Sequence, residues 1–188
     1  MVKENMKKQK VQETIKLDLG CGNNKQQGFK GVDFVKTEAT DVVHDLFKFP
    51  WPFKDNSVDE VFCSHFFEHV PQLLRGKFMD EAYRIMKPGS KFTIITPYYS
   101  STRAVQDFTH QWPPLCEHSY LYFNKKWRQD NKLTHGHYDI KCDFDFSWGF
   151  SADPGFVSRS EEVRNFANRH YINAIMDLHT ILTKRESP

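Results

Sequence analysis

The segment from Lys16 to Gly22 combines an acidic side chain with a glycine turn in a way that suits a charged ligand. Gly20 and Gly22 follow a short apolar run, and glycines at this spacing let the backbone turn sharply and approach a ligand without a Cβ atom in the way. The third glycine of a dinucleotide fingerprint is absent, because the three residues after Gly22 include none. Asp18 would repel a pyrophosphate and attract a cation. The segment therefore favours a nucleoside-like ligand that carries positive charge.

Two further carboxylates stand at the ends of the next two apolar runs. Asp33 lies in the run from Gly31 to Phe34, at the place where nucleotide-binding α/β folds hydrogen-bond ribose hydroxyls. Asp45 follows the run from Asp41 to Val43 and can accept from the exocyclic amine of adenine, with apolar surface from Leu46. Each acid alone is typical of a solvated loop. Together, at three successive strand ends, they favour S-adenosylmethionine, which has an ammonium, a sulfonium and no phosphate.

The chain resembles the class I, seven-stranded S-adenosylmethionine-dependent methyltransferases, specifically the small single-domain type. The resemblance covers about residues 14–97 and rests on five stretches taken together: Leu17–Gly22, Gly31–Asp33, Pro52–Asp59, Ser64–His69 and Arg84–Gly89. It implies a Rossmann-like α/β fold with a mostly parallel seven-stranded sheet, one antiparallel strand near the C-terminus and helices on both faces. It also implies S-adenosyl-L-methionine as cofactor and S-adenosyl-L-homocysteine as product.

The same resemblance implies which residues contact the cofactor. They stand at the ends of the first four strands and are Asp18, Leu19, Gly20, Cys21, Gly22, Asp33, Phe34, Asp45, Leu46, Ser64 and His65. Asp18 and the two glycines of the turn would face the methionine part. Asp33 would bind the ribose, and Asp45 with Leu46 the adenine. Ser64 and His65 would line the floor of the pocket.

The connection between the first two strands departs from the pattern of the family. Only ten residues separate Gly22 from Asp33, and Gly28 interrupts them. The usual helix between these strands must therefore be short or absent. We expect a more open rim around the cofactor.

The acceptor side is expected after the fourth strand, where look-alike enzymes have their acceptor pocket. Methyl transfer from a sulfonium is an in-line displacement with an activated leaving group, so positioning can supply most of the catalysis. A base is needed only when the proton of the acceptor must leave in or near the transition state. His65 is the expected catalytic histidine, whereas Glu68 and His69 suit a role near the acceptor and a bracing role in the following turn equally well.

Asp107 and His110 form a second candidate pair, three residues apart in an aromatic-rich segment. On a turn over the carboxyl edge of the sheet they would form a histidine base oriented by an acid. The alternative is that the two residues form a structural pair that holds the segment in place. The predicted catalytic residues are thus His65, His110 and Asp107.

A metal site is not expected from the spacing of histidines and cysteines. Six of these side chains fall within one 33-residue window: His110, Cys116, His118, His135, His137 and Cys142. Zinc sites normally show CxxC or HxxxH spacing, and neither occurs in this window.

Short apolar runs and one helical repeat predict the elements that hold these residues. The predicted strands are Thr14–Leu19, Gly31–Phe34, Asp41–Val43, Val58–Cys63, Lys91–Thr96, His137–Phe146 and Met176–Thr183. Helical spacing of apolar residues predicts a helix over Gln72–Lys87, ended by Pro88 and Gly89, and Glu161–Ala174 is expected to be helical. The strand, helix and strand between Val58 and Thr96 form one parallel crossover. An insert of about residues 97–136 follows it.

Length and composition point to one domain. We expect a flexible basic N-terminal segment over residues 1–12 and a single domain over residues 13–188. The formal net charge of +2 indicates neither nucleic acid nor an acidic membrane, and no apolar run approaches the roughly 20 residues that cross a bilayer. The four cysteines are widely separated and no secretory leader precedes them, which predicts free thiols and a cytoplasmic location.

Aromatic side chains are concentrated in and after the insert, where 13 of the 28 lie between Tyr98 and Phe150. They could stack a planar acceptor, but a local core under a long loop is the safer expectation.

The leading hypothesis is a methyltransferase that acts on a small molecule, a glycan end or a macromolecular terminus. The alternative is a non-catalytic protein that binds S-adenosylmethionine or serves as a scaffold with the same fold. A dinucleotide-dependent oxidoreductase is disfavoured by the missing third glycine and by Asp18. The acceptor, the methylated atom and the oligomeric state are left open by the sequence.

Overall fold

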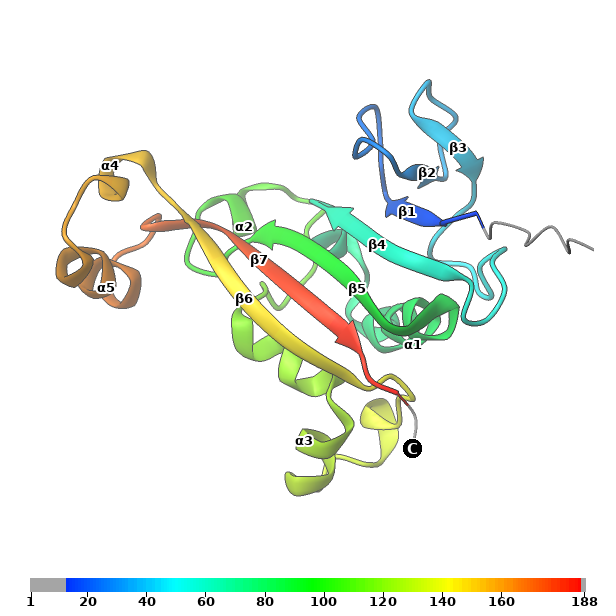
Figure 1. Ribbon diagram of the computed structural model, residues 1–188. Helices are drawn as coiled ribbons and strands as arrows, with labels where there is room; N and C mark the ends of the chain where they lie inside the picture. The colour runs from blue at the N-terminus through cyan, green and yellow to red at the C-terminus, as the bar shows by residue number, and fades with distance from the viewer. Residues whose placement is uncertain (1–12, 187–188) are drawn as a thin grey trace, which may run out of the picture.

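The computed structural model describes residues 13–186 and shows one seven-stranded sheet (Figure 1). The strands are β1 (Lys16–Leu19), β2 (Lys30–Asp33), β3 (Thr40–Val43), β4 (Val58–Ser64), β5 (Met86–Pro97), β6 (Phe144–Ala152) and β7 (Ile175–Lys184). Their order across the sheet is β3-β2-β1-β4-β5-β7-β6. The pairs among β1 to β5 are parallel, and β7 is antiparallel to both of its neighbours. The predicted sheet with one antiparallel strand near the C-terminus is confirmed.

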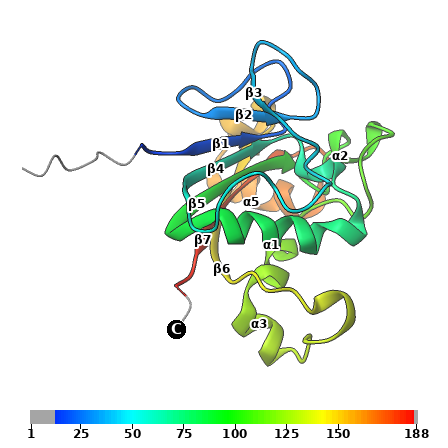
Figure 2. The same cartoon turned by 90° about the vertical axis from the view of Figure 1, so that its right-hand side faces the viewer.

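Helical segments are short apart from two. The α-helices are α1 (Arg75–Ile85), α2 (Arg103–Gln106), α3 (Lys125–Asp130), α4 (Pro154–Val157) and α5 (Glu161–His170). The 3-10 turns are η1 (Phe67–His69), η2 (Gln72–Leu74), η3 (Glu117–Phe123) and η4 (Gly136–Tyr138). In Figures 1 and 2, α1 lies along β4 and β5, whereas α4 and α5 stand at the far tip of the β6–β7 hairpin.

Helix α1 makes the crossover between β4 and β5 and supplies one side of the core. Its apolar positions recur at helical spacing, so Phe78, Met79, Ala82 and Ile85 all face inward and are fully buried. The ring of Phe78 meets the buried indole of Trp51 edge on, with ring centroids 5.0 Å apart. The predicted helix is confirmed, although it begins three residues later, after η2.

The connection from β1 to β2 contains turns and no helix across residues 20–29. The Oδ2 atom of Asp18 accepts a hydrogen bond from the backbone N–H of Gln26 at 2.7 Å, which folds the loop back over the end of β1. Lys25 pairs with Asp41 on β3 at 2.6 Å and holds the far side of the loop. The expected loss of this helix is confirmed.

Two predicted boundaries are wrong. The strand expected over His137–Phe146 begins only at Phe144, because Asp80 on α1 accepts the backbone N–H groups of Lys141 and Cys142 at 2.7 and 2.8 Å. These donors are therefore taken by a side chain instead of a sheet ladder. The turn expected at Pro88 and Gly89 lies inside the bounds of β5, where the register with β4 shifts.

The insert between β5 and β6 divides into a buried and an exposed set of aromatic rings. Tyr98, Tyr120 and Phe123 are buried and belong to the main core, as expected. Tyr99 and Trp112 are 51% and 75% exposed, so the expectation of a local core is wrong for these two. The predicted basic segment over residues 1–12 lies outside the described residues. Within residues 13–186, no helix has the length and apolar character that crossing a bilayer requires.

Candidate functional site

The carboxyl ends of β1, β2, β3, β4 and β5 meet at one edge of the sheet, because these strands are parallel and adjacent. This edge is where open α/β sheets bind ligands. The backbone N–H of Gly20 donates to the carbonyl of Val32 at 2.8 Å, and that of His65 donates to the carbonyl of Ile95 at 2.9 Å. The glycine turn and His65 therefore begin directly where the sheet ladder ends.

Asp18 is a buried carboxylate that faces no cationic side chain. Only 3% of the residue is exposed, and within the described residues it forms no ion pair with lysine, arginine or histidine. Burial raises its pKa from 3.8 to about 6, and the hydrogen bond from Gln26 offsets this only in part. A bound cation would stabilise the ionised form, so the residue fits the ammonium or sulfonium of the expected ligand.

The glycine turn is closed on one side and open on the other. Gly20 has a φ of +72°, and a Cβ atom there would lie 2.3 Å from ring atoms of Phe66. Gly22 has a φ of +52°, and a Cβ atom there would meet nothing within 4 Å. Phe66 also stacks on Phe47, with centroids 5.8 Å apart. The backbone at Gly22 is thus the approachable part, while Leu19 and Cys21 are buried beneath it.

Asp33 ends β2 and ties two loops together. Its Oδ2 atom accepts from the N–H of Gly22 at 2.9 Å, and its Oδ1 atom accepts from the N–H of Val35 at 3.0 Å. Each carboxylate oxygen has a second lone pair that two ribose hydroxyls can use. The next side chain, Phe34, is 69% exposed.

Asp45 and Leu46 sit beyond the end of β3, as the sequence pattern predicts. The Oδ1 atom of Asp45 accepts from the N–H of Phe47 at 3.0 Å, while its other oxygen lies 3.6 Å from the Lys48 ammonium. Leu46 is buried, and its carbonyl accepts from the indole N–H of Trp51 at 3.1 Å. These contacts hold a polar and an apolar group side by side at the edge, which suits a purine.

His65 follows Ser64 in a left-handed backbone conformation, with a φ of +52°. Its side chain is 39% exposed, and its Nδ1 atom lies 3.4 Å from Oε1 of Glu68. The contact with Glu68 raises the pKa of His65 above its ordinary 6.5. An imidazole whose Nδ1 faces a carboxylate keeps its Nε2 for other partners, which is the arrangement of an oriented base.

Asp107 and His110 are brought together only loosely, at 3.9 Å between Oδ2 and Nε2. The firmer connection runs from Asp107 to another histidine. The hydroxyl of Thr109 donates to Oδ1 of Asp107 at 2.7 Å and contacts Nδ1 of His69 at 2.9 Å. His69 and His110 meet edge to face, with ring centroids 4.7 Å apart. The insert thus delivers an acid, a hydroxyl and a histidine to the turn after β4.

The comparisons with known proteins concern the strands that form this edge. Residues 17–94 match the family model described as a methyltransferase domain. These residues run from β1 into β5 and include Asp18, the glycine turn and His65. This stretch, fewer than half of the 188 residues, is therefore similar to a methyltransferase domain. No curated protein sequence matches the chain.

Solved structures share the fold of this chain at low sequence identity. A SAM-dependent methyltransferase from Archaeoglobus fulgidus is 20% identical, with 92% of this chain and 87% of that chain covered at a TM-score of 0.60. The 1,6-didemethyltoxoflavin-N1-methyltransferase of Burkholderia thailandensis, with S-adenosylhomocysteine bound, is 11% identical. The comparison covers 92% of this chain and 71% of that chain, with a TM-score of 0.56. A putative methyltransferase of Haloferax volcanii, in complex with its Trm112 activator, is 16% identical. The comparison covers 93% of this chain and 83% of that chain, with a TM-score of 0.51.

Two residues of the candidate site are not predicted from the sequence: Phe66, which covers Gly20, and Thr109, which links Asp107 to His69. Glu68, for which the sequence left an acceptor role and a bracing role open, is buried beside His65. The sequence offers only a weak signal for Phe66, which belongs to a stretch that resembles the family. It offers none for Thr109, whose partner His69 lies 40 residues away.

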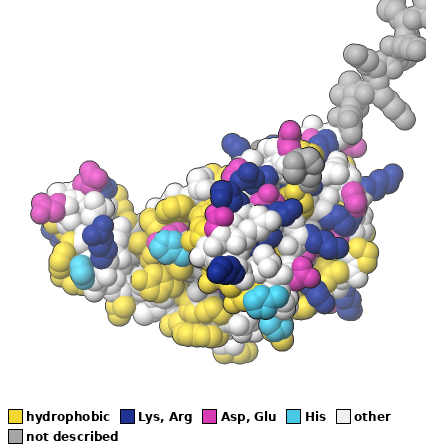
Figure 3. Space-filling view, turned by 90° about the horizontal axis from the view of Figure 1, so that it is seen from below, with side chains coloured by type: hydrophobic (Ala, Val, Ile, Leu, Met, Phe, Trp, Pro, Cys, Tyr) yellow, Lys and Arg dark blue, Asp and Glu magenta, His cyan; other side chains and the backbone are white. Residues whose placement is uncertain are grey.

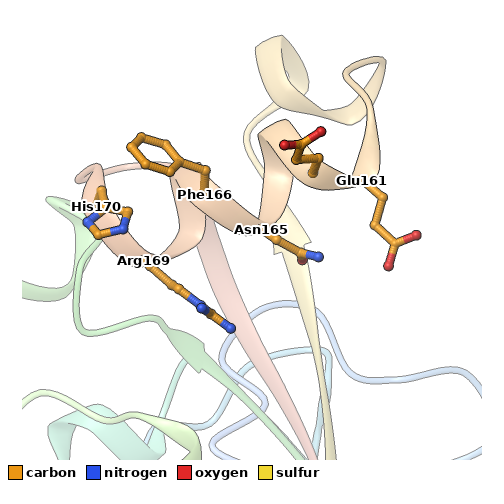
Figure 4. A pocket seen from close by; sticks show the side chains of 6 residues that line it. Glu161, Asn165, Phe166, Arg169 and His170 are labelled. Atoms are coloured by element: carbon orange, nitrogen blue, oxygen red, sulfur yellow. The ribbon is translucent and has the colours of Figure 1, made fainter.

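The described surface has one hollow beside the insert and another on α5, at the tip of the β6–β7 hairpin. The first, of about 400 Å³, is lined by Tyr99, Val105, Trp112, Pro114 and Cys116. Figure 3 shows hydrophobic side chains gathered in the middle of one face, between the projecting α5 end and the main body. The second hollow lies on α5, and all the side chains in Figure 4 come from that one helix, so it is an open surface.

Proposed function

We propose that this chain binds S-adenosylmethionine across the ends of β1, β2 and β3 and transfers its methyl group to an acceptor held beside His65. The observation that carries the proposal is Asp18, a buried acid with a raised pKa and no cationic partner among the described residues, next to an open glycine backbone. A buried carboxylate is costly unless a cation or several donors compensate it. A ligand ammonium at this place supplies that compensation.

Each part of the cofactor then has a partner of suitable chemistry. Asp18 holds the methionine part, and the absence of a Cβ atom at Gly22 lets the cofactor approach the turn. Asp33, which accepts from the N–H of Gly22, accepts from the ribose hydroxyls through its remaining lone pairs. Asp45 accepts from adenine, and Leu46 covers the ring. When bound, S-adenosylmethionine supplies a methyl group on a sulfonium, which is already an activated leaving group.

The residues after β4 and β5 shape the acceptor side. Ser64 and His65 lie at the end of β4, and the hollow next to Tyr99 and Trp112 lies beyond the end of β5. This hollow is mostly apolar and suits a flat or apolar acceptor group. His65, oriented by Glu68, takes the proton of the acceptor when that proton must leave. Fixing the acceptor in line with the methyl group supplies the rest of the rate.

Calorimetric titration with S-adenosylmethionine tests the cofactor half of the proposal. The wild-type chain is expected to bind, and Asp18→Asn is expected to lose about tenfold or more in affinity, because one charged contact of this kind contributes roughly 1.5–3 kcal/mol. Asp130→Asn, on the exposed end of α3, is the matched control and should bind as wild type does. Equal affinity in all three proteins would contradict the assignment of Asp18.

A labelling experiment tests the transfer half. The protein is incubated with methyl donor labelled in its methyl group and with fractionated cell extract, and the labelled product is then identified. A labelled product shows turnover and names the acceptor. Cofactor binding without a labelled product in any fraction would support the alternative, a non-catalytic binding or scaffold protein. We also propose a cytoplasmic location, because the four cysteines, Cys21, Cys63, Cys116 and Cys142, are free.

A further inference from the structure

A cluster of ligand-type side chains lies beside the acceptor side and takes no part in the cofactor site. Glu68 and His69 come from η1, and His110 comes from the loop after α2. One ligand atom of each lies within 4.8 Å of the other two. We propose that Glu68, His69 and His110 form a binding site for a divalent first-row transition metal of the zinc type.

Hydrogen bonding sets both imidazoles in the state that a metal needs. The single hydroxyl proton of Thr109 goes to Asp107, so Nδ1 of His69 must donate its own proton to the Thr109 oxygen. The carbonyl of Ala104 can only accept, so Nδ1 of His110, 3.2 Å away, donates as well. The Nε2 atom of each neutral ring then carries a lone pair, and the Oδ2 atom of Asp107 lies 3.9 Å from Nε2 of His110, beyond hydrogen-bond distance. Metal-binding histidines usually donate their other ring N–H to an acceptor in this way.

Glu68 brings a buried carboxylate oxygen that lacks a partner. The residue is only 6% exposed, and its Oε2 atom forms no hydrogen bond with any of the residues that the structure describes. The other oxygen, Oε1, faces His65 at 3.4 Å. A buried anionic oxygen without a donor is unfavourable, and a cation held by Oε2 removes that penalty.

Backbone and arginine contacts assemble the three side chains before any ion binds. The N–H of Gln111 donates to the carbonyl of Glu68 at 2.9 Å, which fastens the loop of His110 to η1. The buried Arg75 donates to the carbonyls of Gln111 and Pro113 at 3.0 and 2.8 Å and holds the same loop from α1. Folding therefore already brings η1 and the loop of His110 together, so metal binding does not have to supply the entropic cost of doing so.

The ligand set indicates both the metal and its coordination. Two imidazoles and one carboxylate suit Zn²⁺ or Co²⁺, whereas Mg²⁺ and Ca²⁺ prefer oxygen ligands alone. Zinc holds such atoms at about 2.0–2.2 Å, so the three side chains must close in slightly on the ion. His69 and His110 are partly exposed, which leaves a fourth position open to water or to an oxygen of the acceptor.

The test uses the full-length chain, stripped of metal by a chelator, and titrates it with CoCl₂ and with ZnCl₂. We expect one equivalent of Co²⁺ to bind with a visible ligand-field spectrum, and Zn²⁺ to displace it. His110→Ala and Glu68→Gln should each weaken metal binding by roughly 100-fold or more. Loss of a residue that only hydrogen-bonds a metal ligand already costs about 10–100-fold in affinity, and these two are ligands themselves. His118→Ala and His137→Ala, which lie outside the cluster, should bind as wild type does.

A second pair of variants covers the case in which a ligand variant fails to fold. Thr109→Val removes the acceptor for Nδ1 of His69 and should weaken Co²⁺ binding about tenfold, whereas Thr109→Ser keeps the hydroxyl and should restore it. Circular dichroism checks folding in each variant. Absence of Co²⁺ binding in the wild type, an unchanged spectrum in folded His110→Ala, or equal loss in the control variants would each overturn the proposal. None of these readouts depends on methyl transfer, so a failure here is separate from a failure of the proposed function.

Discussion

The two halves of the sheet edge build their sites in different ways. On the cofactor side, Asp18, Asp33 and Asp45 each lie in or just after the end of their own strand, and neighbouring parallel strands bring them to one edge. On the acceptor side, His69 meets Thr109 through a loop that returns to the edge from beyond β5. The first arrangement follows from strand order alone. The second depends on how an irregular insert packs, and its side chains are correspondingly harder to foresee.

The largest expected effect separates the halves by function. His65→Ala should lower turnover about 100-fold or more, because it removes the oriented base at the end of β4. Its affinity for S-adenosylmethionine should stay within about tenfold of wild type, roughly 1.4 kcal/mol. The measurements are labelled-product formation with the identified acceptor and calorimetric titration with the cofactor.

His44→Ala is the matched control, since His44 follows β3 as His65 follows β4. Its side chain contacts the carbonyl of Lys48 at 3.0 Å and has no place in the proposed chemistry, so turnover should be unchanged. A fully active His65→Ala protein would remove His65 from the catalytic residues. The cofactor side and the acceptor side of the sheet edge would then differ in structure, but the acceptor side would have no base at His65.

The next effect concerns stability on the cofactor side. Gly20→Ala should lower the free energy of unfolding by about 2–5 kcal/mol, for two reasons. The left-handed backbone at this position is unfavourable for alanine, and the new Cβ atom would clash with the ring of Phe66. Gly28→Ala has a similar φ, +83°, but nothing lies within 4 Å of its Cβ, so only about 1–2 kcal/mol is expected. Urea unfolding of the two variants measures the difference. Equal losses would mean that the contact with Phe66 is not a tight one.

The sequence predicts where the acids of the cofactor side lie, because this information is local. The place of Asp18 follows from the glycine turn after it, and that of Asp33 from the end of a strand. The contact between Phe66 and Gly20 joins residues from two strand ends, so no local pattern indicates it. On the acceptor side, spacing predicts the pair of Asp107 and His110, which lie 3.9 Å apart, but it does not show that Thr109 also connects Asp107 to His69.

The same contrast explains the two errors in the fold. Alternation of apolar residues indicated a strand over His137–Phe146, but it cannot show that Asp80 takes the backbone donors of Lys141 and Cys142. Pro88 and Gly89 indicated the end of the helix, which is confirmed, and also a turn, but β5 runs through them with a shift in register. Local sequence patterns do not predict the backbone conformation where it depends on a distant side chain or on pairing with a neighbouring strand. The spacing rule for zinc cannot indicate the proposed cluster of Glu68, His69 and His110, because its members come from separate segments.

The smallest expected effect is a pH dependence of cofactor binding. The pKa of Asp18 is about 6 in the folded chain against 3.8, so the folded state takes up a proton between these values that the unfolded state does not. The contribution of Asp18 to the unfolding free energy of the free protein should therefore fall as pH rises from about 4 to 6 and stay level above. A cationic ligand prefers the ionised acid, so its affinity should be constant above about pH 7 and weaken by up to tenfold per unit as pH falls below 6.

The groups that face Asp18 allow this dependence to be assigned. Burial raises the pKa of the neighbouring thiols Cys21 and Cys63 above their ordinary 9, so both stay neutral throughout the range. Asp33 is the other acid near the turn, and its carboxylate already accepts two backbone N–H groups. Calorimetric titration of S-adenosylmethionine at pH 5, 6, 7 and 8 should give the predicted fall for wild type and a flat, weaker profile for Asp18→Asn. A slope that survives in Asp18→Asn would mean that a group other than Asp18 titrates, and a flat wild-type profile would mean that the ligand cation does not rest against Asp18.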